Sequence, residues 1–531
     1  MKSPLLATGL LALLSSAPAL AQCESAEIQG SMAQPFDYFG KSVNTDGATI
    51  VVGAFSAGNE RPGAAYVFAQ DNGMWIETAM LTPSDGGAGD EFGNSVGISG
   101  DVIVVGAEYN DNDVGNNAGT AYIFELQGGV WLETTKLRAL DASQGQHFGE
   151  YVATSNGVVL IGARQDADLG NNSGAAYVFE KIAGAWTQTG KLIGSDGERN
   201  DLSGDTVAIQ GDRIVMASYR NDASAGNSGA AYVFERTPAG WSETGKLVAN
   251  DAAGEMGRGV ALDGDRIVLG ARKDNTQGSE SGAGYVFELL NGEWIQTAKL
   301  LPSAAGDGVW VGESVAIQGD RILLSAHHQS QKGFNSGAGY VFELIDGDWV
   351  ETKLLESTSL RPLDEFSYAV SMAGDIAVLT SPFREMSTGV AHVFSLAGDC
   401  GGGGGLEPGS ALPYGEDVGG SNIGTLSTVS VPTIGGTMEL EIANIPNGTS
   451  GVLWISLTQT ALPAFGGTIL SDRGSAPVKL RFKLVSGSTT LGWEIPAGVL
   501  GKTLYMQAAA FDGTQPAGLA LTNGLAVSPG E

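Results

Sequence analysis

A short motif, AYVF or a close variant, recurs along the chain at intervals of 52 to 56 residues. Its aromatic positions are Tyr66, Tyr122, Tyr177, Tyr232, Tyr285 and Tyr340, with His392 in a seventh copy. In the first six copies a tryptophan follows nine positions later. Strand-rich repeats of roughly 40–50 residues form propeller blades, which bury their apolar faces against neighbouring blades. The period therefore predicts an all-β fold, a seven-bladed β-propeller.

Each repeat holds four short apolar runs separated by turns. In the fifth repeat the runs cover residues 259–262, 266–270, 282–288 and 294–300. The first three are almost continuously apolar, which is typical of strands covered on both faces. The fourth alternates, as expected for an outer strand with one face in water. The seven blades are expected to start at Phe39-Gly40, Phe92-Gly93, Phe148-Gly149, Leu202-Ser203, Met256-Gly257, Val311-Gly312 and Phe366-Ser367.

The seventh repeat has no tryptophan strand, because the chain runs into five glycines at 401–405. Counting back from Phe39 by the usual spacing predicts that residues 23–30 supply the missing strand and close the ring, which removes the open sheet edges. Cys23 and Cys400 then flank the position of the absent turn. We expect a disulfide between them, and two unrelated free thiols are the alternative.

The repeats resemble the FG-GAP repeats of the integrin α-subunit propeller. The resemblance lies in FGKSV at 39–43, VVGA at 51–54 and GAAYVF at 63–68, and it extends over about residues 22–400. Integrin-type repeats bind calcium in a D-x-D-x-D-G loop between their first two strands. Here that loop is a tight turn in every copy, such as Gly264-Asp265, so those ligands do not transfer to this chain.

The two ends of the chain differ from the repeats. Residues 1–21 read as a secretory signal peptide, with a basic start, a short apolar run and a small-residue cleavage site. Residues 401–411 form a Gly-rich linker, and residues 412–531 are expected to fold as a small β-sandwich of about seven strands. The last stretch of that domain is similar to the carboxy-terminal domain of many secreted bacterial multi-domain proteins.

The charge limits the classes of partner. The chain has 59 acidic and 28 basic residues, a net charge of −31. Such a field repels nucleic acid and anionic membranes. Apart from the signal, no segment is continuously apolar for long enough to span a bilayer. We therefore expect a secreted protein, extracellular or at the cell surface, with no nucleic-acid partner and no membrane insertion.

Polar loops on one rim are candidates for a cation site. In these loops Asp111 and Asp113, like Asp166 and Asp168, are spaced so that two carboxylates can meet one ion, and Asp222 occupies a similar loop. Calcium prefers six to eight oxygen ligands, which nearby amides and carbonyls could complete. Asx turns without a metal account for the same residues. Calcium is the one cofactor that the sequence suggests, and neither interpretation is decided.

The repeat is broken most visibly in its sixth copy, at Trp310 and at His327-His328. These three residues are the candidate ligand-binding site, although neighbours on a strand point to opposite faces and make a poor chelate. Sequence signals for catalysis are weak: residues 93–97 match G-x-S-x-G formally, but Ser95 occupies a regular repeat slot and no helix follows it. The interpretation we favour is a non-catalytic binding or adhesion protein that presents its loops to an extracellular protein or glycan. The alternative is an extracellular lyase or hydrolase acting on polysaccharide, because acidic residues are plentiful on one rim.

Overall fold

The computed structural model divides the chain into two units, residues 1–400 and 401–531. It describes residues 24–58, 61–224, 226–251 and 254–397, and in the second unit only the strands between residues 411 and 527. The signal segment, Cys23 and Cys400 lie outside the described residues. No helix in the described part of the chain has the length and apolar character needed to cross a membrane.

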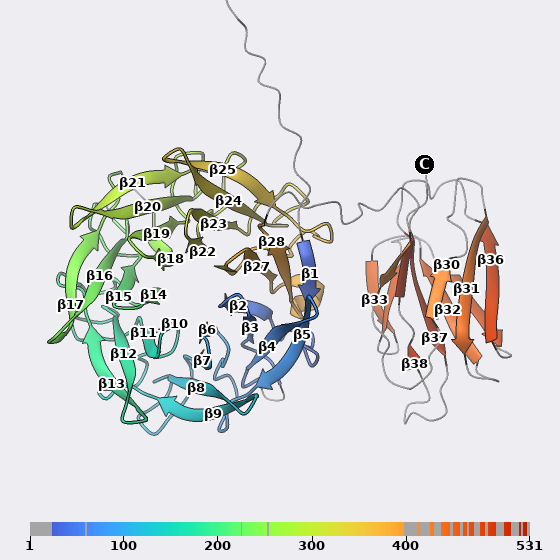
Figure 1. Ribbon diagram of the computed structural model, residues 1–531, viewed down its shortest axis with the longest axis horizontal. Helices are drawn as coiled ribbons and strands as arrows, with labels where there is room; N and C mark the ends of the chain where they lie inside the picture. Colours follow the sequence, from blue (N-terminus) through green and yellow to red (C-terminus); the bar gives the residue numbers. More distant parts are fainter. Residues whose placement is uncertain are drawn as a thin grey trace, which may run out of the picture. The chain divides into compact units, whose positions relative to one another are not determined.

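The first unit is a ring of seven four-stranded antiparallel sheets (Figure 1). The strands of the first three blades are β2(Phe39–Thr45), β3(Thr49–Ala54), β4(Ala64–Asp71) and β5(Met74–Leu81), then β6(Ser95–Ser99), β7(Val102–Ala107), β8(Thr120–Gln127) and β9(Val130–Leu137), then β10(Val152–Ser155), β11(Val158–Ala163), β12(Ala175–Ile182) and β13(Ala185–Leu192). The prediction of a seven-bladed propeller is confirmed.

The next three blades repeat this order. They comprise β14(Val207–Gln210), β15(Arg213–Ser218), β16(Ala230–Thr237) and β17(Gly240–Leu247), then β18(Met256–Asp263), β19(Arg266–Ala271), β20(Ala283–Leu290) and β21(Glu293–Leu300), then β22(Val315–Gln318), β23(Arg321–Ala326), β24(Ala338–Ile345) and β25(Asp348–Leu355). In the fifth blade, β18 starts three residues before the predicted run, because Met256 already pairs with Ala271 of β19.

The seventh blade joins the two ends of the propeller. It contains β26(Val370–Ala373), β27(Ile376–Ser381) and β28(Val390–Ser395), with the short segment α1(Arg384–Ser387) before β28. Its outer strand is β1(Glu24–Ile28), which pairs antiparallel with β28. The ring therefore closes as the spacing predicts. The disulfide expected beside this junction falls outside the described residues.

The phenylalanine and the tyrosine of the repeat pack against each other inside each of the first three blades. Phe39 and Tyr66 are fully buried, with ring centroids 5.4 Å apart in an edge-to-face arrangement. Glycine is required where neighbouring blades meet: a side chain at Gly63 would place its Cβ 1.9 Å from the carbonyl oxygen of Phe92. The equivalent bridge in the fourth blade is made by Ser203, so that blade starts at Ser203-Gly204, one residue later than predicted.

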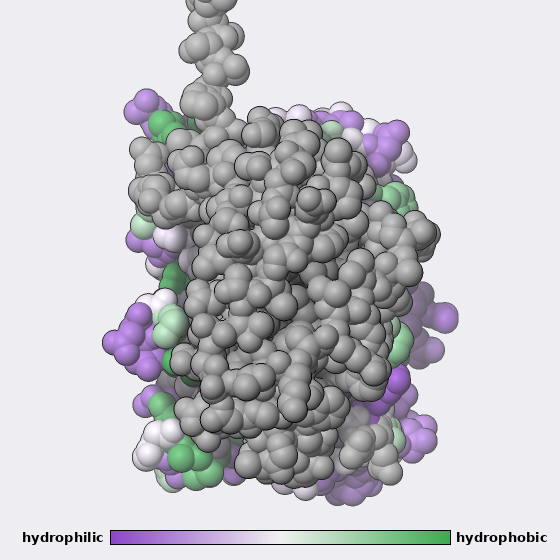
Figure 2. Space-filling view, turned by 90° about the vertical axis from the view of Figure 1, so that its right-hand side faces the viewer, coloured by the Kyte–Doolittle hydropathy of each residue, from purple (hydrophilic) through white to green (hydrophobic). Residues whose placement is uncertain are grey.

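The outer strands alternate between water and the sheet below. In β9 the burial pattern switches at every residue, and Leu132 remains 45% exposed. The described surface visible in Figure 2 is mainly hydrophilic, with separate hydrophobic areas between the polar side chains. This agrees with the predicted role of the fourth strand as the outer edge of each blade.

The second unit also consists of strands. One sheet contains β29(Ala411–Tyr414), β39(Gly524–Val527), β37(Leu504–Ala510), β32(Ser450–Ser456) and β35(Val478–Lys483), with β38(Ala520–Leu521) beside β37. A second contains β30(Thr425–Thr428), β31(Thr437–Ile445) and β36(Gly487–Glu494), and a third pairs β33(Thr460–Ala464) with β34(Gly467–Ser471). All-β character follows from these strands, whereas the sandwich arrangement and the resemblance to a secreted-protein domain stay predictions.

Candidate functional site

The innermost strands of the blades enclose a central cavity of about 600 Å³. One repeat position contributes a lining residue from every blade, directly after the Phe–Gly pair or its equivalent. We call this ring of seven residues the mouth. Its members are Lys41, Asn94, Glu150, Asp205, Arg258, Glu313 and Tyr368. The same backbone position thus carries basic, acidic, amide and aromatic side chains.

A second ring of variable side chains comes directly before the Phe–Gly pair or its equivalent. Every one of these residues has a left-handed backbone, with φ between 48° and 58°, although none is glycine. They are Tyr38, Glu91, His147, Leu202, Glu255, Trp310 and Glu365. Such a conformation is costly for large side chains and is concentrated at functional sites. The repeat therefore keeps a strained residue in each blade at this end of the channel.

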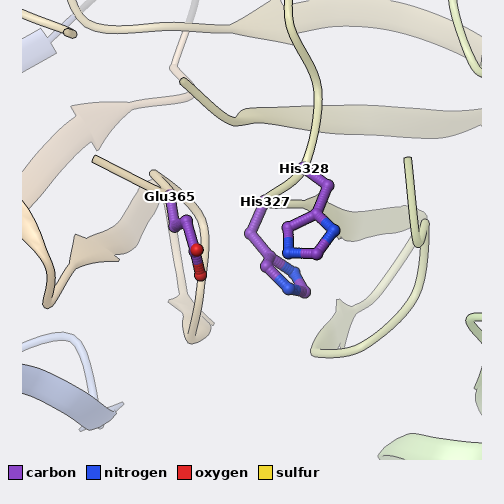
Figure 3. Close-up of side chains that lie close together, drawn as sticks. All are labelled: His327, His328 and Glu365. Carbon is purple, nitrogen blue, oxygen red and sulfur yellow. The ribbon is translucent and has the colours of Figure 1, made fainter. Parts of the chain in front are cut away.

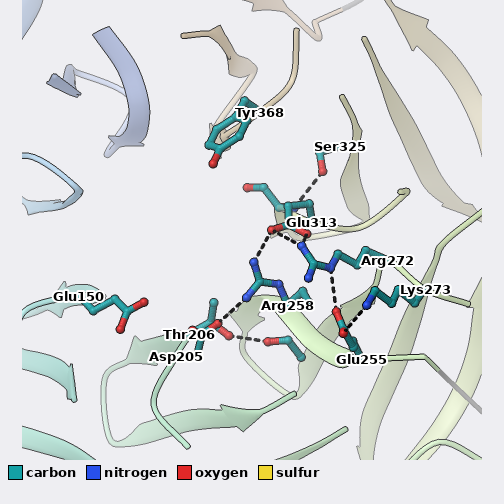
Figure 4. A network of polar contacts seen from close by, with 12 residues as sticks. Glu150, Asp205, Thr206, Glu255, Arg258, Arg272, Lys273, Glu313, Ser325 and Tyr368 are labelled. Carbon is teal, nitrogen blue, oxygen red and sulfur yellow. Dashed lines mark hydrogen bonds and ion pairs between the residues drawn. The ribbon is translucent and has the colours of Figure 1, made fainter. Parts of the chain in front are cut away.

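Charged side chains on the fourth to sixth blades form one network (Figure 4). Arg258 donates to Asp205 at 2.9 Å and to Glu313 at 2.6 Å, while Arg272 pairs with Glu313 at 3.2 Å. Burial alone would raise the pKa of Glu313, but the two guanidinium groups outweigh it and lower that pKa to about 2. The Glu313 carboxylate is therefore ionised and held in a fixed position across neutral pH.

A second group of charges lies on the second and third blades. Arg164 pairs with Glu150 and, at 3.2 Å, with Asp205. One carboxyl oxygen of Glu150, Oε2, is buried without a hydrogen-bond partner. Burial and the negative charges of Glu108 and Asp205 raise the pKa of Glu150 well above its usual value. Burial and Glu108 also raise the pKa of Glu91 to about 7.

Aromatic side chains from the sixth, seventh and first blades contact one another in a continuous series. We call this chain of ring contacts the aromatic arc; in order, its members are His328, Trp310, His327, Tyr368, Phe383, Tyr38 and Phe55. Consecutive ring centroids are 4.2 to 5.9 Å apart. Lys41 Nζ donates to the Tyr368 hydroxyl at 2.8 Å. The arc comes from the sixth, seventh and first blades and adjoins the charged network, because the Arg272 guanidinium lies 5.1 Å from the centre of the Trp310 ring.

The predicted calcium loops hold their carboxylates in turns and ion pairs. Asp111 accepts a hydrogen bond from the Asn117 backbone at 2.9 Å, and Asp222 accepts one from Asn227 at 2.6 Å. Asp113 pairs with Arg138. The structure therefore does not bring Asp111, Asp113 and Asp222 together at one point, and the turns expected for these sequences are present.

Asp166 and Asp168 do lie together, with Asp141, but around a lysine. Lys191 Nζ is 2.6 Å from Asp141, 2.9 Å from Asp166 and 2.7 Å from Asp168. An ammonium group thus occupies the place that a bound cation would take. Binding of calcium by these loops stays a prediction.

The three predicted ligand-binding residues of the sixth blade come together at the mouth end of the channel. Trp310 stacks on His328, with centroids 4.2 Å apart, and His327 lies beside Tyr368. The expectation that the two histidines point to opposite faces is wrong. The strand β23 ends at Ala326, so both residues lie in the following turn, and their rings are 4.4 Å apart. Burial lowers the pKa of His327 to about 3, so its ring is neutral.

Sequence reasoning did not find the residues of the mouth. The sequence does contain a signal for them, because Lys41, Glu150, Arg258 and Glu313 occupy the same position of the repeat in different blades. Positions that build the blades stay constant across the copies, such as the tyrosine of AYVF. The positions after the Phe–Gly pair instead change in charge from blade to blade. An alignment of the seven copies against one another would have separated the two classes.

Six segments of the chain match the FG-GAP repeat, namely residues 24–68, 75–124, 131–179, 186–234, 241–287 and 294–342. Each runs from the fourth strand of one blade through the third strand of the next, and the first begins at β1. Among curated proteins no match was found.

Several solved structures are similar to the chain at 11–12% identity. One is the β-propeller domain of the Trilobed protease from Pyrococcus furiosus, with a TM-score of 0.37, covering 65% of this chain and 91% of that chain. Another is an exo-β-1,3-galactanase from Phanerochaete chrysosporium, with a TM-score of 0.28, covering 71% and 94%. A third is an acylaminoacyl peptidase from Pyrococcus horikoshii, with a TM-score of 0.36, covering 76% and 57%.

Proposed function

The chain belongs to the FG-GAP repeat family, and from that premise we propose that it is a secreted, non-catalytic binding protein whose mouth binds an extracellular glycan. One observation carries the proposal. The variable positions of an otherwise regular repeat converge on the mouth, where Phe55 and Tyr368 of the aromatic arc line the same cavity as the paired charges of Asp205, Arg258 and Glu313. A binding site built in this way varies its chemistry without disturbing the blades that support it.

The aromatic and charged side chains at the mouth have the chemistry needed to bind a sugar. Flat aromatic rings offer apolar faces to the C–H surfaces of a pyranose, and carboxylates with guanidinium groups exchange hydrogen bonds with hydroxyl groups. Arg258 and Arg272 are already fixed by Glu313 (Figure 4), so a ligand need not order them. Little conformational entropy is then lost on binding. The net charge of −31 favours neutral or cationic partners over nucleic acid.

The test is a glycan-binding screen followed by calorimetric titration of the best ligand. Phe55→Ala removes a ring of the aromatic arc that lines the cavity and is expected to weaken binding at least about tenfold, as loss of an aromatic binding contact does. Phe334→Ala is the matched control, because Phe334 is 68% exposed and lies outside the arc. Equal affinities in the two variants would contradict the proposal. Binding of a protein in place of a glycan would keep the mouth as the site and change the ligand class.

An enzyme acting on polysaccharide is the second candidate, and Glu150 favours it. A carboxyl group whose pKa is raised by burial and by neighbouring carboxylates, with one oxygen free of hydrogen bonds, is suited to general-acid catalysis. Turnover of a polysaccharide by the protein, lost in Glu150→Gln and kept in Glu293→Gln, would establish this function over simple binding. Glu293 is the control because it is exposed on β21, away from the mouth.

Export of the protein is part of the proposal. Residues 1–21 have the features of a cleaved signal, and we propose that the mature chain begins near Gln22. Amino-terminal sequencing of the secreted protein tests this directly. A chain that retains Met1 and stays inside the cell would contradict it.

A further inference from the structure

Four groups in the described part of the chain bring together three histidine, aspartate or glutamate side chains with metal-ligand atoms within 4.8 Å of one another. Three of these groups contain a cation supplied by the protein. Lys191 lies among Asp141, Asp166 and Asp168. The other two are Glu108, His147 and Glu150, which Arg164 joins, and Glu24, Glu27 and His392, which Arg384 joins through Glu27.

The fourth group is His327, His328 and Glu365, and no ion pair links any of them to a basic side chain in the described residues. The two histidines follow β23 of the sixth blade, and Glu365 precedes β26 of the seventh (Figure 3). The carboxylate and the two imidazole rings thus come from neighbouring blades at the mouth end of the channel. This group differs from the other three because its negative charge has no internal partner.

One ligand atom of this group is buried and unused. His327 is only 3% exposed, and its Nδ1 is buried with no hydrogen-bond partner. A buried polar atom left without a partner carries a free-energy cost, so a native site that keeps one needs a reason. A metal ion bonded to that nitrogen would remove the cost.

The surroundings hold the second histidine in place. The His328 ring stacks on Trp310, whose Nε1 donates to Glu280 at 3.1 Å. A hydrogen bond also joins the His328 ring to the backbone of Gly308. Metal-binding histidines are typically oriented in this way, by a hydrogen bond from the ring nitrogen that does not hold the metal.

We propose that His327, His328 and Glu365 bind a divalent transition-metal ion of the Zn²⁺ class. Two imidazoles and one carboxylate are a ligand set typical of zinc, whereas calcium and magnesium prefer oxygen alone. Donors around tetrahedral zinc lie roughly 3.3 Å apart, so the present spacing needs a small closure of the side chains. Three protein ligands leave one position open, and a glycan hydroxyl or carboxylate at the mouth could occupy it.

The test uses the full mature protein, purified without a histidine tag, and Zn²⁺ alone as the probe in isothermal titration calorimetry. We expect one ion bound per chain. Glu365→Gln should raise the dissociation constant at least about tenfold. Glu91→Gln is the matched control, because Glu91 occupies the same repeat slot in the second blade with the same left-handed backbone. Its affinity for Zn²⁺ should be unchanged.

A second readout protects against a misfolded variant. Co²⁺ in place of Zn²⁺ should give visible absorption bands of a four- or five-coordinate site in the native protein. These bands should be lost in His328→Gln and kept in His147→Gln, whose histidine belongs to a group with its own arginine. No binding of Zn²⁺ by the native protein, or equal binding by Glu365→Gln and Glu91→Gln, would overturn the proposal. The readout is metal binding alone, so its outcome is separate from that of the glycan screen.

Discussion

Lysine side chains on the fourth strands occupy positions where a bound cation would otherwise fit. Lys136 pairs with Asp85 at 2.6 Å and Lys246 with Asp196 at 2.7 Å, which repeats the arrangement around Lys191 in neighbouring blades. Opposite charges at this distance stabilise one another, and a like-charged cluster without the ammonium would repel. The acidic loops are therefore neutralised by residues of the repeat itself.

Lys191→Met should leave three carboxylates facing one another. We expect the variant to lose about 2 kcal/mol of stability, since Asp166 is buried and would lack its charge partner. Millimolar calcium should raise the melting temperature of the variant more than that of the native protein, measured by differential scanning fluorimetry. Lys181→Met is the control, because its pair with Glu125 is more exposed and worth under about 1 kcal/mol. Equal calcium responses in Lys191→Met and the native protein would contradict this prediction.

Because of Glu313, the free energy of unfolding of the native protein should decrease at acidic pH. The folded-state pKa of Glu313, about 2, lies below its usual value of 4.5, so the unfolded chain binds more protons between these two pH values. The stabilisation is complete above pH 4.5 and is lost as the pH falls toward 2, by about 3 kcal/mol. Glu313→Gln should be less stable than the native protein at pH 7 and nearly equal to it at pH 2.

Chemical denaturation at a series of pH values measures the effect. The slope of stability against pH below 4.5 should be shallower in Glu313→Gln, while Glu293→Gln, at an exposed turn, should follow the native curve. Parallel curves for the native protein and Glu313→Gln would show that the Arg258 and Arg272 contacts do not hold this carboxylate.

The residues of the mouth could be located from the sequence, but their partners could not. Arg258 meets Asp205 and Glu313, which are 53 and 55 residues away on the two adjacent blades. The repeat indicates that the three slots are equivalent, yet only the geometry of the ring decides that Arg258 reaches both carboxylates. The two histidines were misjudged for a similar reason, because the last residue of β23 decides whether they follow strand geometry.

At the scale of the element, the spacing of the repeats alone is enough to predict the position of β1. The strand was predicted from a missing tryptophan segment, and it pairs with β28 from Glu24 to Ile28. Side chains make this junction specific: His392 Nδ1 is 2.7 Å from Glu24, and Arg384 donates to Glu27 at 3.0 Å. Spacing predicts the strand, whereas the contact with Glu24 depends on His392 replacing the usual tyrosine of the motif.

The predicted disulfide would fasten the same junction. Cys23 precedes β1 and Cys400 follows β28, and the intact mass of the secreted protein should be lower by two hydrogens before reduction than after it. The Cys23→Ser variant should unfold more easily, by up to about 5 kcal/mol on the chain-entropy model for so long a loop. The Cys23→Ser, Cys400→Ser double variant should match the single one. Reaction of both thiols with a maleimide in the native, unreduced protein would contradict the disulfide.

At the scale of the whole molecule, the buried apolar clusters form a closed series that joins each blade of the propeller to the next and the seventh to the first. Each apolar cluster of the propeller is shared between neighbouring blades, and the one containing Ile28 and Phe39 also includes Val378 and Ala391 of the seventh blade. Among the residues that the structure describes, the buried members of these clusters run from Ile28 to Leu396. Closure therefore supplies every blade with two covered faces, which an open row of blades would lack at its ends.

A chain of residues 22–400 should consequently fold without the second unit. We expect the same melting temperature as the full mature protein, within about 2 °C, because the hydrophobic burial that stabilises the propeller is retained. Affinity for Zn²⁺ should also be unchanged, since His327, His328 and Glu365 all lie within this range. A matched chain of residues 31–400 lacks β1 and leaves the edge of β28 unpaired. It should melt well below the longer one or associate through that edge, as size-exclusion chromatography would show. If both chains melted alike, closure by β1 would not be what stabilises the ring.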